Sequence, residues 1–321
     1  MNKLTVSSSP HVRSAETTTR IMLDVIIALL PALVAATVLF GTRALVLSAT
    51  CVITSVVAEF ICRKVMKRDN TLGDLSAIVT GLILSFNLPA TVPLWIAAIG
   101  SIFAIVVVKQ MFGGIGQNFV NPAMTARIVL MVSFPVAMAR CINPFENAWS
   151  ADAITSATPM AVLNGGDGEL PSLLDMFLGA HGGAMGEVSA AALLLGGLYL
   201  IVRRVISPAI PVSFIGTVAL LTLVAGKGDI EFMLYHILGG GLFLGAFFMA
   251  TDYVTCPLTF KGRIVFGIGC GVITSVIRLF GSLPEGVSFS IILMNIFVPY
   301  IERLTTPRPF GTSKAKKEGK A

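Results

Sequence analysis

Ten long apolar runs, separated by short polar or basic segments, constrain the fold of this chain more than any other feature. They cover roughly residues 21–40, 44–62, 74–88, 92–109, 119–138, 189–202, 206–225, 230–250, 263–280 and 287–301. A bilayer core needs about 20 apolar residues in helical form, and these runs are continuous instead of alternating. Only helices and closed barrels satisfy backbone polar groups in lipid. The runs therefore predict an all-α integral membrane protein with about ten transmembrane helices.

The distribution of basic residues predicts the orientation of these helices. If the N-terminus is cytoplasmic, most Lys and Arg fall in cytoplasmic segments, and the other face keeps Arg43, Arg140, Lys227 and Arg278. This is the asymmetry of the positive-inside rule. We therefore expect a multi-pass protein of the cell (inner) membrane with both termini cytoplasmic and the polar segment 139–188 facing outward. Short basic loops beside membrane spans account for the net charge of +6, so lipid and not nucleic acid is the expected contact.

The predicted organisation has five parts, which are a cytoplasmic N-terminal tail (1–20), a first five-helix half (21–138), the outward-facing segment (139–188), a second five-helix half (189–302) and a basic cytoplasmic C-terminal tail (303–321). A weak internal repeat supports the two halves. Asn121-Pro-Ala-Met-Thr-Ala-Arg127 and Cys256-Pro-Leu-Thr-Phe-Lys-Gly-Arg263 both contain Pro, Thr and Arg before an Ile-Val pair. Two halves of five spans are inserted with opposite orientation, so the sequence favours two inverted five-helix repeats.

Titratable residues give few direct indications of chemistry. The five cysteines show no C-x-x-C spacing and the three histidines are scattered, so no metal site is predicted within the chain. Buried acids in membrane spans are usually paired or line an ion path. Sequence spacing suggests that Glu59 pairs with Arg63 and Asp24 with Arg20. Asp252, beside two threonines, is the acid that we expect to be functional.

Thr158 lies in the polar outward segment, within Thr155-Ser-Ala-Thr158-Pro. A threonine hydroxyl can form a phosphoester with FMN, and the small or turn-forming neighbours Ser156, Ala157 and Pro159 would leave it accessible to a modifying enzyme. The tripeptide is not specific, because Ser48-Ala-Thr50 repeats it inside the second apolar run. From the residues alone, the favoured interpretation of Thr158 is a helix N-cap or a turn residue.

Several motifs together resemble one family. They are Asp74-Leu-Ser-Ala-Ile-Val-Thr-Gly-Leu82 with Asn87-Leu-Pro89, Gly113-Gly-Ile-Gly-Gln-Asn118 before Asn121-Pro-Ala-Met-Thr-Ala-Arg127, and Thr155-Ser-Ala-Thr158-Pro. With the ten spans, they make the chain similar to the D subunit of the Rnf complex, an ion-translocating ferredoxin:NAD oxidoreductase. The B subunit of the Na⁺-translocating NADH:quinone reductase shares that family but carries a longer N-terminal extension.

The resemblance implies a covalent FMN on Thr158, flanked by Ser156, Ala157 and Pro159. Many family members have Ser-Gly-Ala-Thr where this chain has Thr-Ser-Ala-Thr. It also implies a second, non-covalent flavin (riboflavin), for which the cytoplasmic segments offer Asn118, Asn121, Thr125, Arg127 and Asp252, residues that could equally border an ion path.

The implied function is that of a membrane subunit of an electron-transport complex, with electrons carried on FMN between ferredoxin and NAD and coupled to Na⁺ or H⁺ movement. The implied partners are an outward-facing flavoprotein subunit, iron–sulfur subunits and a flavin transferase for maturation. The enzyme is the complex, so the chain alone should catalyse little. The alternative is an inverted-repeat solute transporter or channel without a redox role, which would explain the spans but not a flavin on Thr158.

Overall fold

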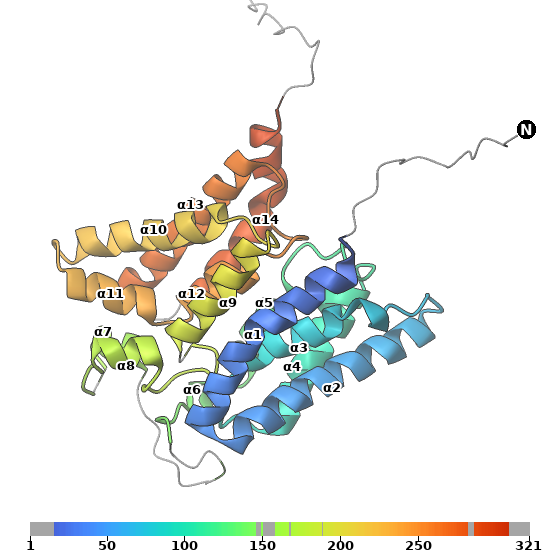
Figure 1. Ribbon diagram of the computed structural model, residues 1–321, viewed down its shortest axis with the longest axis horizontal. Coiled ribbons are helices and arrows are strands. Elements are labelled where there is room, and N and C mark those ends of the chain that lie inside the picture. The colour runs from blue at the N-terminus through green and yellow to red at the C-terminus, as the bar shows by residue number, and fades with distance from the viewer. Residues whose placement is uncertain are drawn as a thin grey trace, which may run out of the picture.

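The computed structural model describes residues 16–145, 149, 158–166, 168–187, 189–281 and 286–307. All regular secondary structure in these ranges is helical (Figure 1), which confirms the predicted all-α class. The first group of helices comprises α1 (Thr18–Phe40), α2 (Thr42–Val65), η1 (Leu72–Asp74), α3 (Ser76–Phe86), α4 (Leu94–Ile102), its π-helical continuation η2 (Phe103–Gln110), and α5 (Pro122–Ser133). The last group comprises α9 (Ala190–Val202), α10 (Ala209–Ala225), α11 (Ile230–Leu238), α12 (Leu242–Leu244), its π-helical continuation η3 (Gly245–Met249), α13 (Phe260–Phe280) and α14 (Val287–Thr305). Between them lie the short helices α6 (Pro135–Ala139), α7 (Pro159–Leu163) and α8 (Leu173–Leu178).

Four helices of the described chain are long and apolar enough to cross a membrane, namely α1, α2, α13 and α14. A fifth span is formed if α11 and α12–η3, which meet at a bend of 60°, are counted together. The remaining apolar helices are 10–17 residues long. The protein is therefore a multi-pass membrane protein, although several of its predicted spans are shorter or less regular than the apolar runs suggested.

Two of the predicted spans are broken, for identifiable reasons. The run 119–138 is interrupted at Phe134, because the residue before a proline is pushed out of the helical conformation. The run 230–250 is interrupted by three glycines, two of which, Gly240 and Gly241, have φ values of 65° and 64°. Such left-handed backbone favours glycine.

A buried arginine stabilises the second break. The Arg278 guanidinium, on α13, donates hydrogen bonds to the carbonyl oxygens of His236, Gly239 and Gly240. These carbonyls belong to the end of α11 and the glycine turn, where no further helical turn can satisfy them. Arg278 is 1% exposed, and the dipoles of these backbone carbonyl groups stabilise its charge.

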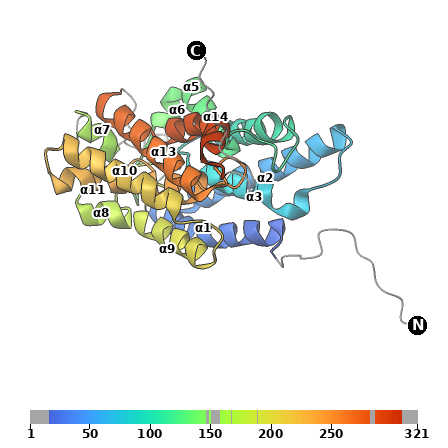
Figure 2. The same cartoon turned by 90° about the horizontal axis from the view of Figure 1, so that it is seen from above.

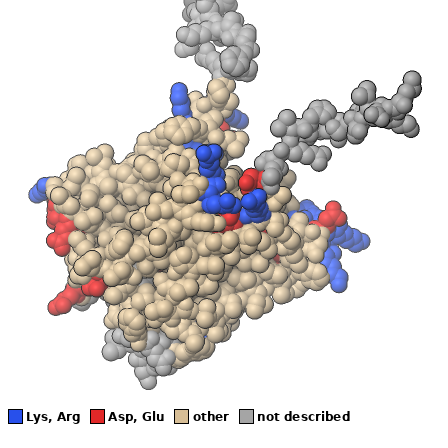
Figure 3. All heavy atoms as spheres, viewed as in Figure 1, with Lys and Arg blue, Asp and Glu red and all other residues tan. Residues whose placement is uncertain are grey.

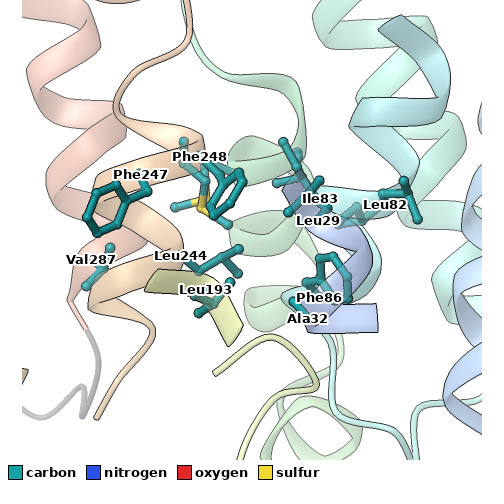
Figure 4. Packing of buried hydrophobic residues seen from close by; sticks show 14 of the residues in the cluster. Leu29, Ala32, Leu82, Ile83, Phe86, Leu193, Leu244, Phe247, Phe248 and Val287 are labelled. Atoms are coloured by element: carbon teal, nitrogen blue, oxygen red, sulfur yellow. The ribbon is translucent and has the colours of Figure 1, made fainter. Parts of the chain in front are cut away.

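The helices form two groups that meet along the middle of the molecule (Figures 1 and 2). In the first group α2 packs on α3 and α4, and α4 packs on α5; in the second, α10 packs on α11 and α13, and α13 packs on α14. The pairs α1–α9 and α5–α14 join the groups. One apolar core runs through the junction. Figure 4 shows Leu29, Ile83 and Phe86 from one group close to Leu193, Leu244 and Phe248 from the other.

A glycine on α9 sets how closely the two groups approach. A Cβ built on Gly196 would lie 2.0 Å from the carbonyl oxygen of Ala28 on α1. Small residues permit such close backbone contact between membrane helices. We expect Gly196→Ala to lower the free energy of unfolding by about 1–3 kcal/mol, because a backbone atom must move to accept the methyl group.

Gly216→Ala on α10 is the matched control for that prediction, because its Cβ would meet no atom within 4 Å. Thermal unfolding of the purified protein in detergent should separate the two variants, with Gly216→Ala close to the wild type. Equal stability of both variants would contradict the packing argument.

Charged side chains lie at the two ends of the helices. Figure 3 shows a broad band without charge across the face in view, with most Lys and Arg atoms on one side of it and acidic atoms prominent on the other. The first side includes the start of α1 and the ends of α2, α9 and α14 (Figure 1), and we call it the basic end. The segment that holds α7 and α8 lies at the other end, which we call the acidic end.

Candidate functional site

Thr158 is the N-cap of α7 at the acidic end. Its backbone is extended (φ −70°, ψ 149°), and its hydroxyl oxygen accepts a hydrogen bond from the Ala161 N–H at 3.3 Å. Pro159 is buried at the first position of the helix, where its missing N–H is not needed. Thr158 itself is partly exposed. Ser156 and Ala157 lie outside the described residues. The N-cap interpretation of Thr158 is therefore correct, and it leaves the hydroxyl hydrogen available.

Helix α7 rests on the break between α11 and α12. Met160, which is 1% exposed, lies against the glycine turn, because a Cβ built on Gly239 would be 3.1 Å from its sulfur. The Tyr235 hydroxyl on α11 donates to the carbonyl oxygen of Pro171 at 2.8 Å and ties the following loop to the same helix. The position of Thr158 is thus set by α11 and by the residues that stabilise its broken end.

A second candidate site is a cavity of about 370 Å³ between the two groups of helices, nearer the basic end. Its walls come from α1, α3, η2, α5, the end of α9 and η3. Most of the lining is apolar and includes Ile83, Phe247 and Phe248. A few polar groups converge on it, which is the usual composition of a site for a small organic molecule.

Three of the five residues predicted for a second flavin or an ion path line this cavity, namely Asn118, Asn121 and Asp252. Asn121 is the N-cap of α5, where its side-chain oxygen accepts from the N–H groups of Ala123 and Met124. Its amide nitrogen donates to the carbonyl oxygen of Met249 at 3.4 Å and links α5 to η3.

The other two predicted residues do not reach the cavity wall. Thr125 donates its hydroxyl to the backbone of Asn121, one turn earlier on the same helix, at 2.8 Å. Arg127 is buried and donates to the side-chain oxygen of Asn87 at 2.8 Å, which connects α5 to the end of α3. Both residues therefore have structural contacts and do not line this cavity, and their predicted part in a second flavin site or an ion path stays a prediction.

Asp252 is partly buried in the loop after η3. Burial raises the pKa of its carboxyl group, and hydrogen bonds from the Val254 N–H and the Thr255 hydroxyl oppose that rise. A carboxyl with a raised pKa on a cavity wall can exchange a proton closer to neutral pH than an exposed one.

A buried ion pair beside the cavity was not predicted from the sequence. Lys109 on η2, 3% exposed, contacts Glu59 on α2 at 2.8 Å and donates to the Ser76 hydroxyl at 2.6 Å. Glu59 also accepts from Thr71 and Gln110, at 2.9 and 3.0 Å. The predicted Glu59–Arg63 pair was therefore wrong. Lys109 closes the apolar run 92–109, and counting it among the cytoplasmic basic residues did not reveal that it is buried.

The predicted Asp24–Arg20 pair was also wrong. Asp24 on α1 accepts from the hydroxyl of Tyr199, on α9, at 2.9 Å and pairs with Arg203, the C-cap residue of α9, at 3.2 Å. This contact joins the two groups of helices next to the cavity. Sequence spacing of i, i+4 indicates only partners on the same helix, which is why Arg20 was predicted as the partner of Asp24.

Known proteins resemble this chain along almost all of its length. The family model described as NQR2, RnfD, RnfE matches residues 5–311. The chain is 51% identical to the D subunit of the Na⁺-translocating ferredoxin:NAD⁺ oxidoreductase complex of Acetobacterium woodii, over 99% of this chain and 98% of that one. It is 46% identical to the D subunit of the proton-translocating ferredoxin:NAD⁺ oxidoreductase complex of Clostridium ljungdahlii, over 98% of each chain. It is 39% identical to the D subunit of the ion-translocating oxidoreductase complex of Stutzerimonas stutzeri, over 91% of this chain and 92% of that one.

Proposed function

Since the chain belongs to the NQR2, RnfD, RnfE family, we propose that it is the D subunit of an ion-translocating ferredoxin:NAD⁺ oxidoreductase complex. The observation that carries this proposal is the 51% identity, over 99% of the chain, to a relative named as that subunit. The transporter alternative gains no support from the relatives named above, all of which are subunits of redox complexes.

We propose that Thr158 is esterified to FMN, which would supply a carrier for electrons at the acidic end. The geometry of Thr158 fits an ester. Its oxygen acts as an acceptor towards Ala161, a role that an ester oxygen keeps, and its hydroxyl hydrogen is not needed for the cap. The rigid backbone of Pro159 and the buried Met160 would fix the attachment point on α11.

The cavity between the helix groups is the proposed site of the second flavin, riboflavin. Its volume of about 370 Å³ lies in the range of small-molecule sites. Phe247 and Phe248 are aromatic groups suited to the faces of a planar ring system. The amides of Asn118 and Asn121 and the ammonium group of Lys109 are suited to its polar edge.

We further propose the inverted repeat and its orientation. The proposed repeat matches α1, α2, α3, α4–η2 and α5 with α9, α10, α11–η3, α13 and α14, in that order. With this matching, the packing contacts within one group correspond to those within the other. The contacts α1–α9 and α5–α14 are then between equivalent helices, across the two-fold axis that would relate the two halves. Under this pairing the two similar motifs, at the starts of α5 and α13, are not equivalent. The positive-inside rule places the basic end in the cytoplasm, the cavity near it, and Thr158 outward.

The proposed partners are an outward-facing flavoprotein subunit near Thr158, iron–sulfur subunits that deliver electrons, and a flavin transferase that loads Thr158. Affinity purification through a tag on this chain from its native membrane tests the proposal. We expect co-purifying subunits and reduction of NAD⁺ by reduced ferredoxin, which stops when this chain is deleted. A chain that purifies alone, without flavin, and transports a solute when reconstituted would support the transporter instead.

The cavity assignment predicts a selective loss of non-covalent flavin. Val25→Trp places an indole in the cavity from α1, so we expect bound riboflavin to fall below about a tenth of the wild-type amount. Acid extraction and chromatography of the supernatant measure it, since covalent flavin stays with the protein. Val34→Trp on the same helix, where the side chain is 60% exposed, is the matched control and should keep its riboflavin. Equal extraction from both variants would refute the cavity assignment.

A further inference from the structure

A second cavity lies beside the first at the basic end, and the proposed function does not use it. Its volume is about 330 Å³, and it is formed by the turn between α9 and α10, the loop after η3 and the first turn of α13. The two cavities share the wall residues Val205, Ile206, Thr251 and Tyr253. The Tyr253 hydroxyl donates to the carbonyl oxygen of Val205, which ties the loop to the α9–α10 turn.

Two arginines from different elements line this second cavity, and no carboxylate is among its lining residues. Arg204 follows α9 and is exposed, and within the described part of the chain it makes no side-chain hydrogen bond or ion pair. Arg263, on the first turn of α13, is partly buried and donates its Nε–H to the carbonyl oxygen of Pro257 at 3.1 Å. That bond orients the guanidinium and leaves its Nη groups as donors.

The neighbouring Arg203 shows the contrast. Its charge is compensated by Asp24 at 3.2 Å, whereas Arg204 and Arg263 have no such acidic partner in the described residues. Arg204 adopts a left-handed backbone with φ 58°, as Lys67 and Lys227 do at other helix ends, so that conformation alone does not mark a site. What indicates a site is that a second arginine, Arg263, lines the same cavity.

Ser207 adds a third donor. Its hydroxyl oxygen accepts from the Ala209 N–H at 3.4 Å, so its hydrogen is free to bond elsewhere. Guanidinium groups bind phosphate oxygens through paired N–H donors, and basic pockets between membrane helices on the cytoplasmic side take anionic head groups. Exposed apolar side chains lie close in sequence to residues that line the cavity. Val202, 79% exposed, follows Ile201 at the end of α9, and Phe260, 65% exposed, begins α13.

We propose that this second cavity binds a phosphate-ester anion, held by Arg204, Arg263 and the Ser207 hydroxyl. The exposed apolar rim favours the head group of an anionic phospholipid, whose acyl chains would cover Val202 and Phe260. Because the two cavities share a wall, the bound lipid would hold the loop containing Thr251 and Tyr253 in place at the mouth of the first cavity. Lipid binding needs only that the basic end lies at head-group level, so it can hold or fail independently of the flavin assignments.

The test is a titration of the purified complex in detergent with dioctanoyl phosphatidylglycerol, read by native mass spectrometry. We expect a saturable adduct on the wild type and binding weakened about tenfold or more in Arg204→Gln/Arg263→Gln, because two cationic donors are lost. Lys67→Gln is the matched control, since Lys67 is also a basic residue in left-handed backbone after a helix and does not line the cavity. It should bind as the wild type does.

Further arms identify the source of the phosphate. Dioctanoyl phosphatidylcholine should bind weakly, and inorganic phosphate should displace phosphatidylglycerol only if the site takes soluble anions. Binding of phosphatidylglycerol that resists millimolar phosphate assigns the site to lipid. Phosphatidylglycerol binding unchanged in the double variant, or equal binding of both lipids, would overturn the proposal. If the double variant does not fold, Arg204→Gln alone carries the test, because that exposed side chain makes no hydrogen bond or ion pair within the described chain.

Discussion

Replacing Thr158 by valine is expected to abolish covalent flavin on this chain. Valine has nearly the same shape but no hydroxyl, so no phosphoester can form. The loss of the N-cap should cost about 1 kcal/mol at α7 and leave the rest of the fold intact. In-gel flavin fluorescence after denaturation measures the effect, and the expected result is complete loss of the band in chain co-produced with its flavin transferase.

Thr50→Val is the matched control, because Ser48-Ala-Thr50 has the same tripeptide as the sequence around Thr158. Thr50 lies within α2, where its hydroxyl donates to the carbonyl oxygen of Val46 at 2.8 Å, so a transferase has no flexible backbone to bind. This variant should keep a full fluorescent band. A band that persists in Thr158→Val, or an intact mass of the native chain without added FMN, would refute the assignment.

Removing one partner of the buried Glu59–Lys109 pair should give the largest loss of stability among single substitutions. In Glu59→Gln the Lys109 ammonium group keeps the Ser76 hydroxyl but loses its counter-charge. Breaking a buried pair in this way costs about 3–5 kcal/mol, because an uncompensated charge stays in a low-dielectric site. Thermal unfolding in detergent would measure it, and non-covalent flavin should fall as well, since Lys109 lines the first cavity.

The double variant Glu59→Gln/Lys109→Met separates charge from packing. It removes both charges and keeps similar volumes, so it should regain most of the stability lost in Glu59→Gln. Asp69 is an exposed carboxylate near the same end of α2, so Asp69→Asn controls for a change in net charge. This variant should leave the unfolding temperature unchanged. A double variant as unstable as Glu59→Gln would mean that the hydrogen bonds from Thr71 and Gln110, rather than the ion pair, hold this region together.

The sequence by itself determined the class of the protein and the location of its helices. Continuous apolar runs can satisfy their backbone in lipid only as helices, and this holds whatever the tertiary arrangement. The runs 119–138 and 230–250 were predicted as continuous spans, and both are interrupted, because Pro135 and the glycines at 239–241 act on the backbone of their own segment. The polar segment around Thr158 was also recognised from its composition, and the structure confirms the predicted N-cap role of Thr158.

Only the tertiary structure decided which residues meet. Glu59 and Lys109 are 50 positions apart, and Asp24 and Tyr199 are 175 apart, so the nearby Arg63 and Arg20 were the natural but wrong partners. Asn118, Asn121 and Asp252 share a cavity, while Thr125 and Arg127, on the same helix as Asn121, face structural partners. A membrane helix is apolar on all sides, so its sequence does not reveal which side faces lipid and which faces a neighbour. That choice is made when the helices pack. The first cavity then lies between the two groups, and the second lies within the last group.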